Sequence, residues 1–275
     1  MLPPALSQHP GPDDESADLD RRFGGLRRLY GEAGYARLRA ARVAVVGLGG
    51  VGSWSAEALA RSGVAEITLI DLDHVAESNI NRQVQALGAT IGQAKAEALR
   101  QRIADIHPGC VVHAVDQFVD EANWPGLLAA PIDAVIDACD QLRAKLAMAA
   151  WSLSNGVPLV IVGAAGGKNK AQAVEVEDLS LVTHDPLLAA LRQRLRKQHG
   201  AARAGCIGLR CVFSREAVKA PADTACDADG SLNCHGYGSS VAVTATFGMV
   251  AAGDCIDIVL NGLLPAMPKP KKSTL

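Results

Sequence analysis

Short apolar runs alternate along much of the chain with longer segments whose apolar residues recur at helical spacing. Five runs predict buried strands: 43–46, 66–71, 111–115, 134–138 and 159–162. Three segments between them predict helices: 53–62, 93–106 and 142–155. Continuous apolar strands that alternate with helices are typical of parallel sheets covered on both faces. We therefore predict an α/β fold, a doubly wound, mainly parallel Rossmann-like sheet with helices on both faces.

The pattern changes on either side of this region. Residues 20–41 have helical periodicity interrupted by glycines, which predicts helical pieces broken at Gly24-Gly25 and at Gly31. After residue 165 we expect these elements: a short strand at 172–176, a basic helix at 185–198, a polar loop at 200–238 and an apolar helix at 241–264. They predict a C-terminal α+β elaboration, residues 166–264, of a domain that begins at residue 21. Residues 1–20 and 265–275 indicate a disordered leader and a disordered basic tail.

Composition indicates a soluble globular protein. Of the 275 residues 49% are hydrophobic and 20% are charged, and the first residues lack the apolar core of a secretory signal. Residues 241–264 are long enough to span a membrane. Because Asp254 and Asp257 within them would each cost about 3 kcal/mol at a bilayer centre, a buried helix, such as one at a subunit interface, is favoured. Seven cysteines without a CxxC pair argue against a zinc ribbon and fit the reduced thiols of a cytoplasmic protein.

Two basic segments lie within a chain whose formal net charge is −2. Residues 21–42 contain seven arginines and one acid, and residues 185–220 contain eight Lys or Arg and two acids. Such segments suit a polyanionic partner or form an ordinary solvated face. From charge alone, the candidates for a nucleic-acid contact are Arg192, Arg194, Arg196 and Lys197. Their spacing does not place all four on one helical face.

A glycine-rich turn follows the first predicted strand, in the sequence VAVVGLGGVG at residues 43–52. Gly47 permits a sharp turn, Gly49 permits close approach of the backbone to a phosphate, and Gly52 permits close packing of the helix on the sheet. The helix N-terminus offers free N–H groups to an anion. Asp71, at the end of the next strand, is placed to accept hydrogen bonds from a ribose hydroxyl. The pattern predicts a nucleotide-binding βαβ unit and, taken alone, an NAD enzyme.

Charged and amide side chains in later loops change this interpretation. Three segments carry them: DLDHVAESNINRQ at 71–83, GQAK at 92–95 and DACDQLR at 137–143. In a parallel sheet these loops leave the carboxyl edge together and surround one crevice. Nicotinamide needs a flat apolar slot there, whereas Arg82 and Lys95 would neutralise phosphate charge and a carboxylate would hold Mg²⁺. The sequence therefore favours ATP over NAD.

The motifs GxGGVG, DxDxVxxSNxNRQ and GxxKA, with the strand-ending Asp140, resemble the adenylating domain of the ubiquitin-activating-enzyme-like family. The resemblance implies that residues 21–165 bind ATP, and that a substrate carboxylate attacks its α-phosphate to give an acyl-adenylate and pyrophosphate. It implies catalytic roles for Arg82, Lys95 and Asp140, with Asp140 as the magnesium ligand. The ATP contacts that it implies are Gly47, Gly49, Gly50, Gly52, Asp71, Asp73, Asn79, Asn81, Arg82, Gln83, Lys95 and Asp140.

The sequences before and after this core are similar to one branch of the family. RRFGGLRRLYGEAG at 21–34, CVFSREAV at 211–218 and the helix after YGSS at 237–240 are similar to one branch, the tRNA threonylcarbamoyladenosine dehydratases. This branch implies that residues 166–264 bind substrate and form a homodimer, with Arg22 or Arg28 reaching the ATP of the partner subunit. The implied substrate is tRNA carrying threonylcarbamoyladenosine at position 37. Its carboxylate is adenylated and its carbamoyl group closes a ring and expels AMP, without an enzyme nucleophile. The resemblance leaves open whether a sulfur-transfer protein works alongside.

Several of these residues, and the function itself, also have alternative interpretations. Asp73 either orders its own loop or contacts ATP, and Asp140 either caps the next helix or binds the metal. Cys234 is either a reactive thiol or an inert loop cysteine, and a monovalent cation in the Gly-rich loops stays open. The alternative functions are an adenylyltransferase for the C-terminal glycine of a ubiquitin-like sulfur carrier, an NAD(P)-dependent oxidoreductase and a nucleotide-sensing module without turnover. The absence of CxxC pairs disfavours the first of these.

Overall fold

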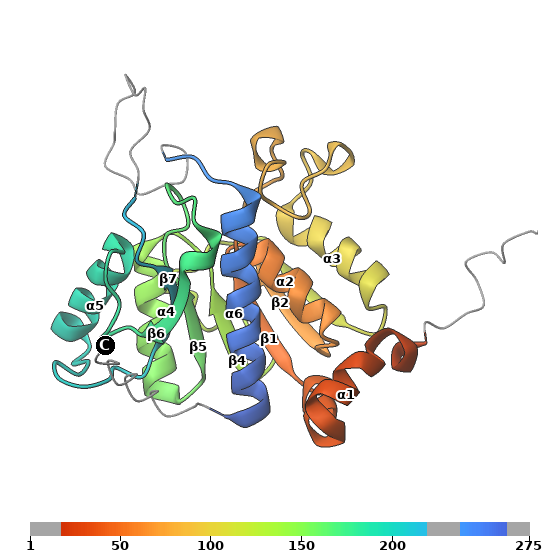
Figure 1. Cartoon of the computed structure of the whole chain (residues 1–275), viewed down its shortest axis with the longest axis horizontal. Coiled ribbons are helices and arrows are strands. Elements are labelled where there is room, and N and C mark those ends of the chain that lie inside the picture. The colour runs from red at the N-terminus through yellow and green to blue at the C-terminus, as the bar shows by residue number, and fades with distance from the viewer. Residues whose placement is uncertain (1–17, 219–236, 263–275) are drawn as a thin grey trace, which may run out of the picture.

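The computed structural model describes residues 18–218 and 237–262 (Figure 1). The elements in order are α1 (Leu19–Leu38), β1 (Arg42–Val46), α2 (Gly52–Arg61), β2 (Glu66–Ile70), η1 (Glu77–Asn79), η2 (Gly88–Thr90), α3 (Lys95–Ile106), β3 (Val111–Val115), β4 (Ala134–Asp137), α4 (Leu142–Asn155), β5 (Leu159–Val162), η3 (Ala171–Ala173), β6 (Val174–Asp178), α5 (Pro186–Gln198), β7 (Arg210–Ser214) and α6 (Val241–Asn261). The predictions for the leader up to residue 17, for the tail and for Cys234 lie outside the described residues.

The strands form a seven-stranded sheet in the order β3-β2-β1-β4-β5-β7-β6. Neighbouring strands pair in parallel, except that β6 is antiparallel to β7. From β1 the chain first moves outward through β2 and β3, and then returns to β4 on the other side of β1. The carboxyl ends of β1 and β4 therefore flank a topological switch point, where ligands bind in sheets of this kind. The predicted fold class is confirmed.

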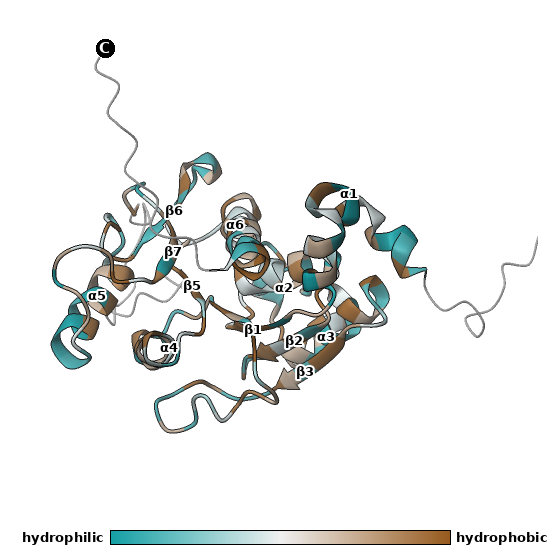
Figure 2. Cartoon of the chain, turned by 90° about the horizontal axis from the view of Figure 1, so that it is seen from below, coloured by the Kyte–Doolittle hydropathy of each residue, from teal (hydrophilic) through white to brown (hydrophobic). Residues whose placement is uncertain are grey.

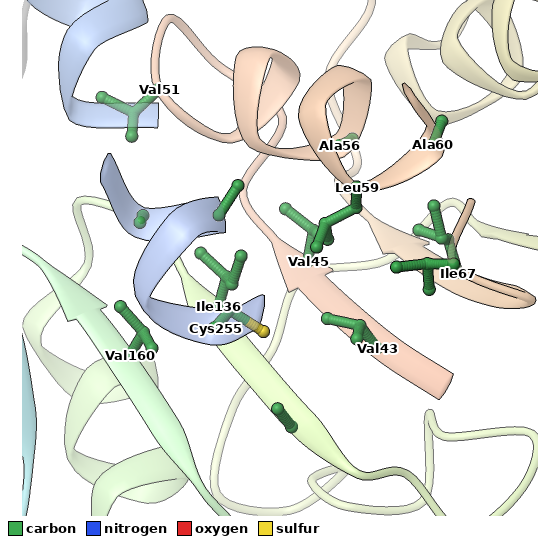
Figure 3. Packing of buried hydrophobic residues seen from close by; sticks show 14 of the residues in the cluster. Val43, Val45, Val51, Ala56, Leu59, Ala60, Ile67, Ile136, Val160 and Cys255 are labelled. Atoms are coloured by element: carbon green, nitrogen blue, oxygen red, sulfur yellow. The ribbon is translucent and has the colours of Figure 1, made fainter. Parts of the chain in front are cut away.

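Helices cover both faces of the sheet (Figure 2). Residues that alternate along each strand fill two separate cores, one under α1, α2, α3 and α6 and the other under α4 and α5. In β1, for example, Val43 and Val45 face the first core, and Ala44 and Val46 face the second. Figure 3 shows Leu59 of α2 and Cys255 of α6 gathered over the first face. The inner parallel strands are covered on both faces, so they need continuous apolar runs, whereas the edge strand β3 is only partly buried.

The apolar C-terminal segment forms α6, which is long and apolar enough to cross a membrane by length and composition. It lies instead across the middle of the sheet and along α2, with most of its apolar window buried. Asp254 is buried and accepts a hydrogen bond from Arg210 Nε at 2.8 Å, so its charge is paired inside the protein. The prediction of a buried helix is confirmed, and the suggested subunit interface stays a prediction.

Two predictions from the sequence pattern are wrong. The predicted loop 200–238 contains β7, which lies between β5 and β6 and buries Cys211, Val212 and Phe213. Its short apolar run is flanked by glycines and polar residues, which obscured it. The helix α1 continues through Gly24-Gly25, because a glycine inside a helix costs only about 1 kcal/mol. The break predicted at Gly31 is confirmed, with φ 72° and ψ 172°.

The glycine turn leaves no space for side chains at two of its positions. Gly47 has a φ of 84°, and a Cβ there would lie 2.7 Å from the backbone nitrogen of Cys139. A Cβ on Gly52 would lie 1.8 Å from the carbonyl oxygen of Gly47. At Gly49 a Cβ would meet nothing within 4 Å. The turn therefore needs glycine at positions 47 and 52 for its own geometry, whereas position 49 faces open space.

This difference makes Gly52→Ala and Gly49→Ala a matched pair for a stability measurement. We expect Gly52→Ala to lower the free energy of unfolding by about 3 kcal/mol, at the upper end of overpacking costs, because backbone atoms cannot rotate away. Gly49→Ala should change it by less than about 0.5 kcal/mol. Urea denaturation followed by circular dichroism measures both. Equal stability of the two variants would show that the close contact does not constrain the turn.

A buried ion pair joins the carboxyl end of β4 to α4. Lys145 and Asp137 are both fully buried, with Lys145 Nζ 3.0 Å from Asp137 Oδ1. Lys145 Nζ also donates to the carbonyl oxygen of Val162, at the end of β5, at 2.8 Å. Burial lowers the pKa of Lys145, but the Asp137 carboxylate more than offsets this, and the net shift is upward. The pair ties two adjacent strand ends to one helix.

Removing the ammonium group should leave an uncompensated carboxylate in the core. We expect Lys145→Met to lower the free energy of unfolding by about 3–5 kcal/mol, and the added substitution Asp137→Asn to restore part of that loss. The measurement is a urea melt of both variants at neutral pH. A loss below about 1 kcal/mol in the single variant, or no recovery in the double variant, would contradict the role of the pair.

Candidate active site

A pocket of about 550 Å³ opens at the carboxyl edge of the sheet, at the predicted switch point. Most of the predicted nucleotide-site residues line it: Gly47, Gly49, Gly50, Asp71, Asp73, Asn79, Arg82, Gln83, Lys95 and Asp140. Figure 1 shows the segment after β2, which supplies several of them, projecting beyond the ends of α3 and α6. Four sequence motifs that are far apart along the chain therefore meet in one cavity.

Asp71 connects the glycine turn to the loop after β2. Its Oδ2 accepts the N–H of Leu48 at 2.5 Å, and its Oδ1 accepts the N–H of Asp73 at 2.8 Å. Burial raises the pKa of Asp71, while Lys95 and the two N–H groups oppose the rise. Each carboxylate oxygen has a second lone pair, and the residue lines the pocket, so the predicted contact with a ribose hydroxyl is compatible with these bonds.

Lys95 lies at the start of α3 with its ammonium group at the pocket. The side chain is 7% exposed, and Nζ lies 2.7 Å from Asp73 Oδ2. The backbone N–H of Lys95 also donates to the carbonyl oxygen of Asp73 at 2.9 Å. Asp73 thus orders its loop by pairing with Lys95, which is the less specific of the two roles considered for it. Two further N–H bonds of the ammonium group are available for a phosphate.

Arg82 is held at the pocket by its neighbours. Its Nη1 donates to the carbonyl oxygen of Ser78 at 2.6 Å and to Asn81 Oδ1 at 2.9 Å. Its own carbonyl oxygen accepts the indole N–H of Trp54, on α2, at 2.9 Å. Asn79 is buried, and its Oδ1 accepts the N–H of Ala76 at 3.0 Å. The guanidinium group therefore enters the cavity from a fixed backbone and keeps further donors for an anion.

Asn81 lies behind Arg82 and does not line the pocket. Its Nδ2 donates to the carbonyl oxygen of Ser239 at 2.9 Å, which connects this loop to the segment before α6. Gly52 lies below the cavity wall, under Gly47. For both residues an ATP contact stays a prediction, and their observed role is to hold the wall in place.

Asp140 is exposed and lines the same cavity, in the loop after β4. Among the described residues its carboxylate has no hydrogen-bond or ion-pair partner. The adjacent Cys139 lines the pocket, and burial raises the pKa of its thiol well above the ordinary value. Asp140 thus brings a carboxylate to the cavity that Arg82 and Lys95 also line. In the described residues no group of three or more His, Cys, Asp or Glu is arranged for a metal ion.

Several lining residues were not predicted. Gln117, Phe118 and Val119 follow β3, and the glycines and alanines of 163–166 follow β5. The rule that loops at the carboxyl ends of parallel strands meet at one edge would have found both groups. Thr244 of α6 and Leu187 of α5 also line the cavity, but no local motif marks them.

The N-terminal arginines lie elsewhere. Arg22 Nη1 donates to the carbonyl oxygens of Asp105 and Ile106, at 2.7 and 2.8 Å, and so caps the C-terminus of α3. Arg28 is exposed. Neither lines the pocket of its own subunit, so a contact across a dimer stays a prediction for both.

The arrangement suits a nucleoside triphosphate. A helix N-terminus, two cations and one carboxylate share a cavity of about 550 Å³, within the usual range for small-molecule sites. Cations of this kind stabilise charge that develops on phosphate oxygens, and a lone carboxylate can share a Mg²⁺ ion with phosphates.

Comparisons with known proteins agree with this geometry. A model of the ThiF family matches residues 21–274. The tRNA threonylcarbamoyladenosine dehydratase of Escherichia coli (strain K12) is 44% identical over 247 residues, covering 86% of this chain and 92% of that protein. The crystal structure of the E. coli tRNA N6-threonylcarbamoyladenosine dehydratase with ATP is 42% identical, with a TM-score of 0.80, and the match covers 89% of this chain and 96% of that one.

A relative named as an adenylyltransferase matches over a shorter length. The molybdopterin-synthase adenylyltransferase of E. coli (strain K12) is 36% identical over 148 residues, which cover 54% of this chain and 58% of that protein. The shared part is thus little more than half of either chain. Since the family model matches most of the sequence and a dehydratase is 44% identical over nearly its whole length, this chain belongs to the ThiF family.

Proposed function

We propose that this protein uses ATP to cyclise threonylcarbamoyladenosine at position 37 of tRNA, with release of AMP and pyrophosphate. One observation carries the proposal: the glycine turn, Arg82, Lys95 and Asp140 line a single cavity. These residues account for activation of a carboxylate by ATP. The choice of substrate is supported by the similarity to dehydratases over nearly the whole chain, including the C-terminal region.

The first step forms an acyl-adenylate. The threonyl carboxylate oxygen attacks the α-phosphorus of ATP, the bond to the bridging oxygen breaks, and pyrophosphate leaves. The N-terminus of α2 and the side chains of Arg82 and Lys95 stabilise the negative charge on the phosphate oxygens. Asp71 holds the ribose, which fixes the α-phosphate relative to the attacking carboxylate.

The second step closes the ring. The carbamoyl nitrogen or oxygen attacks the activated carbonyl carbon, the acyl–phosphate bond breaks, and AMP leaves with one oxygen of the original carboxylate. The proton of the carbamoyl group is released, so the nucleoside has lost one water in total. The substrate supplies its own nucleophile, and the enzyme needs only to position the two groups and exclude competing water.

The free carboxylate of Asp140 fits a Mg²⁺ ion that is shared with phosphates. Magnesium is commonly bound through one or two protein carboxylates together with substrate oxygens, and Asp140 has no other partner among the described residues. When bound, the ion would neutralise charge on the leaving pyrophosphate. The alternative role of Asp140 was to cap α4. The structure does not support this role, because no side chain caps the N-terminus of α4.

We also propose a cytoplasmic homodimer. Three exposed apolar side chains, Ile80, Leu87 and Ile91, lie on the segment that carries Arg82. A second copy covering this segment would bury them and enclose the pocket. A sulfur-transfer protein as a further partner stays a prediction from the resemblance alone.

The proposed reaction has two products that one assay follows. The protein is incubated with ATP, Mg²⁺ and tRNA carrying threonylcarbamoyladenosine, and AMP release and the nucleoside mass are measured. We expect AMP to form in step with the loss of about 18 Da from the nucleoside. AMP formation with a ubiquitin-like sulfur carrier and without tRNA would favour the adenylyltransferase instead.

Variants of two lining residues test the site itself. Asp140→Ala and Arg82→Ala should each lower the rate of AMP formation about 100-fold or more, because each removes charge stabilisation at the phosphates. Glu121→Ala, an exposed carboxylate outside the pocket, is the control and should keep the full rate. Thermal melts should stay within a few degrees of the wild type. Full activity in either site variant would refute the assignment of that residue.

A further inference from the structure

An uncompensated positive charge lies on α5 and the loop that follows it. Residues 186–208 contain these five cations and no acid: Arg192, Arg194, Arg196, Lys197 and Arg203. The structure shows no ion pair for any of the five with another described residue. In both Figure 1 and Figure 2 the helix lies at the outer edge of the molecule.

One face of α5 is buried and the opposite face is basic. Leu187, Leu188, Leu191 and Leu195 pack into the core. On the other side Ala189, Arg192, Gln193, Arg196 and Lys197 follow one helical stripe and, together with Arg203, line a surface hollow of about 420 Å³. Arg194 is not part of this hollow. We call the hollow and its four cations the α5 basic face.

Two of the four cations are held in place by backbone carbonyl groups. Arg192 Nη1 donates to the carbonyl oxygens of Leu179 and Val182, at 2.9 and 2.8 Å. Arg196 Nε donates to the carbonyl oxygen of Ala202 at 3.0 Å. These bonds use part of each guanidinium fork and orient the rest, which lowers the entropy lost when a phosphate binds.

The other basic segment lies in α1, and several of its arginines make contacts within the protein. Arg27 pairs with Asp20, and Arg22 and Arg37 donate to carbonyl groups at the ends of α3 and α6. Arg22 and Arg37 therefore hold α1 on the domain, while the Arg27 pair lies within α1. Contacts within the protein therefore explain the presence of several arginines in α1. In contrast, Lys197 and Arg203 make no hydrogen bond among the described residues.

The N-terminus of the same helix reaches the active-site pocket. Pro186 and Leu187 line that pocket, and Lys197 lies ten residues further along α5, about 15 Å at 1.5 Å per residue. That span corresponds to about four phosphates along one strand of a nucleic acid. We propose that the α5 basic face binds the phosphate backbone of the tRNA while the modified adenosine enters the pocket beside Leu187. This inference rests on the proposed function, since it takes tRNA as the substrate.

The double substitution Lys197→Ala with Arg203→Ala tests the surface without removing a structural contact. Binding to tRNA carrying threonylcarbamoyladenosine is measured by filter binding between about 50 and about 200 mM salt. We expect affinity to fall about tenfold, and the slope of log K against log[salt] to shrink by about 1.4–1.8, the value for two lost phosphate contacts. The KM for tRNA should rise with kcat at saturating tRNA unchanged, because both residues lie outside the active-site pocket.

Arg194→Ala is the matched control, since it removes a charge from the same helix but from outside the hollow. It should leave the salt slope unchanged. If the wild type forms AMP with the tRNA and the double variant has the slope and KM of the Arg194→Ala variant, the docking surface is wrong and the proposed function stands. If the wild type binds the tRNA but forms no AMP, the proposed function itself fails.

Discussion

The contact on which the site depends is the close approach of the glycine turn to the loop after β4. A Cβ on Gly47 would overlap the backbone of Cys139, the residue before Asp140. The backbone next to Asp140 is therefore held against the glycine turn, and among the described residues its carboxylate makes no hydrogen bond of its own. The buried pair Lys145–Asp137 supports the same loop from below by tying the ends of β4 and β5 to α4.

The two cations of the cavity are held by neighbouring groups of the protein. Lys95 is paired with Asp73, and Arg82 donates to a carbonyl oxygen and an amide oxygen of its own loop. These bonds hold the cations close to where phosphate charge would lie, so little side-chain freedom remains to be lost on binding. Phosphate oxygens would compete with the exposed carboxylate of Asp73 for the ammonium group of Lys95, and must attract it more strongly to displace that carboxylate.

Most of the parallel part of the fold could be predicted because its inner strands are buried on both faces and so require unbroken apolar runs. The residues of the site could be predicted because loops at the carboxyl ends of such strands meet at one edge. β7 was missed, since a strand of five residues in a polar, Gly-containing segment carries too little pattern to distinguish it from a loop. Thr244 and the carbonyl partners of Arg22 depend on packing between distant segments, for which one sequence contains no signal.

The state of the thiol in the pocket bears on how the reaction proceeds. Among the described residues Cys139 is the cysteine that lines the cavity, and burial followed by the charge of Asp137 raises its pKa well above the ordinary range. A thiol that stays protonated at neutral pH is a poor nucleophile and will not capture the acyl-adenylate. The activated carbonyl carbon is then left to the carbamoyl group of the same substrate molecule, which is tethered close to it. Burial of Cys139 thus favours ring closure over a covalent enzyme intermediate.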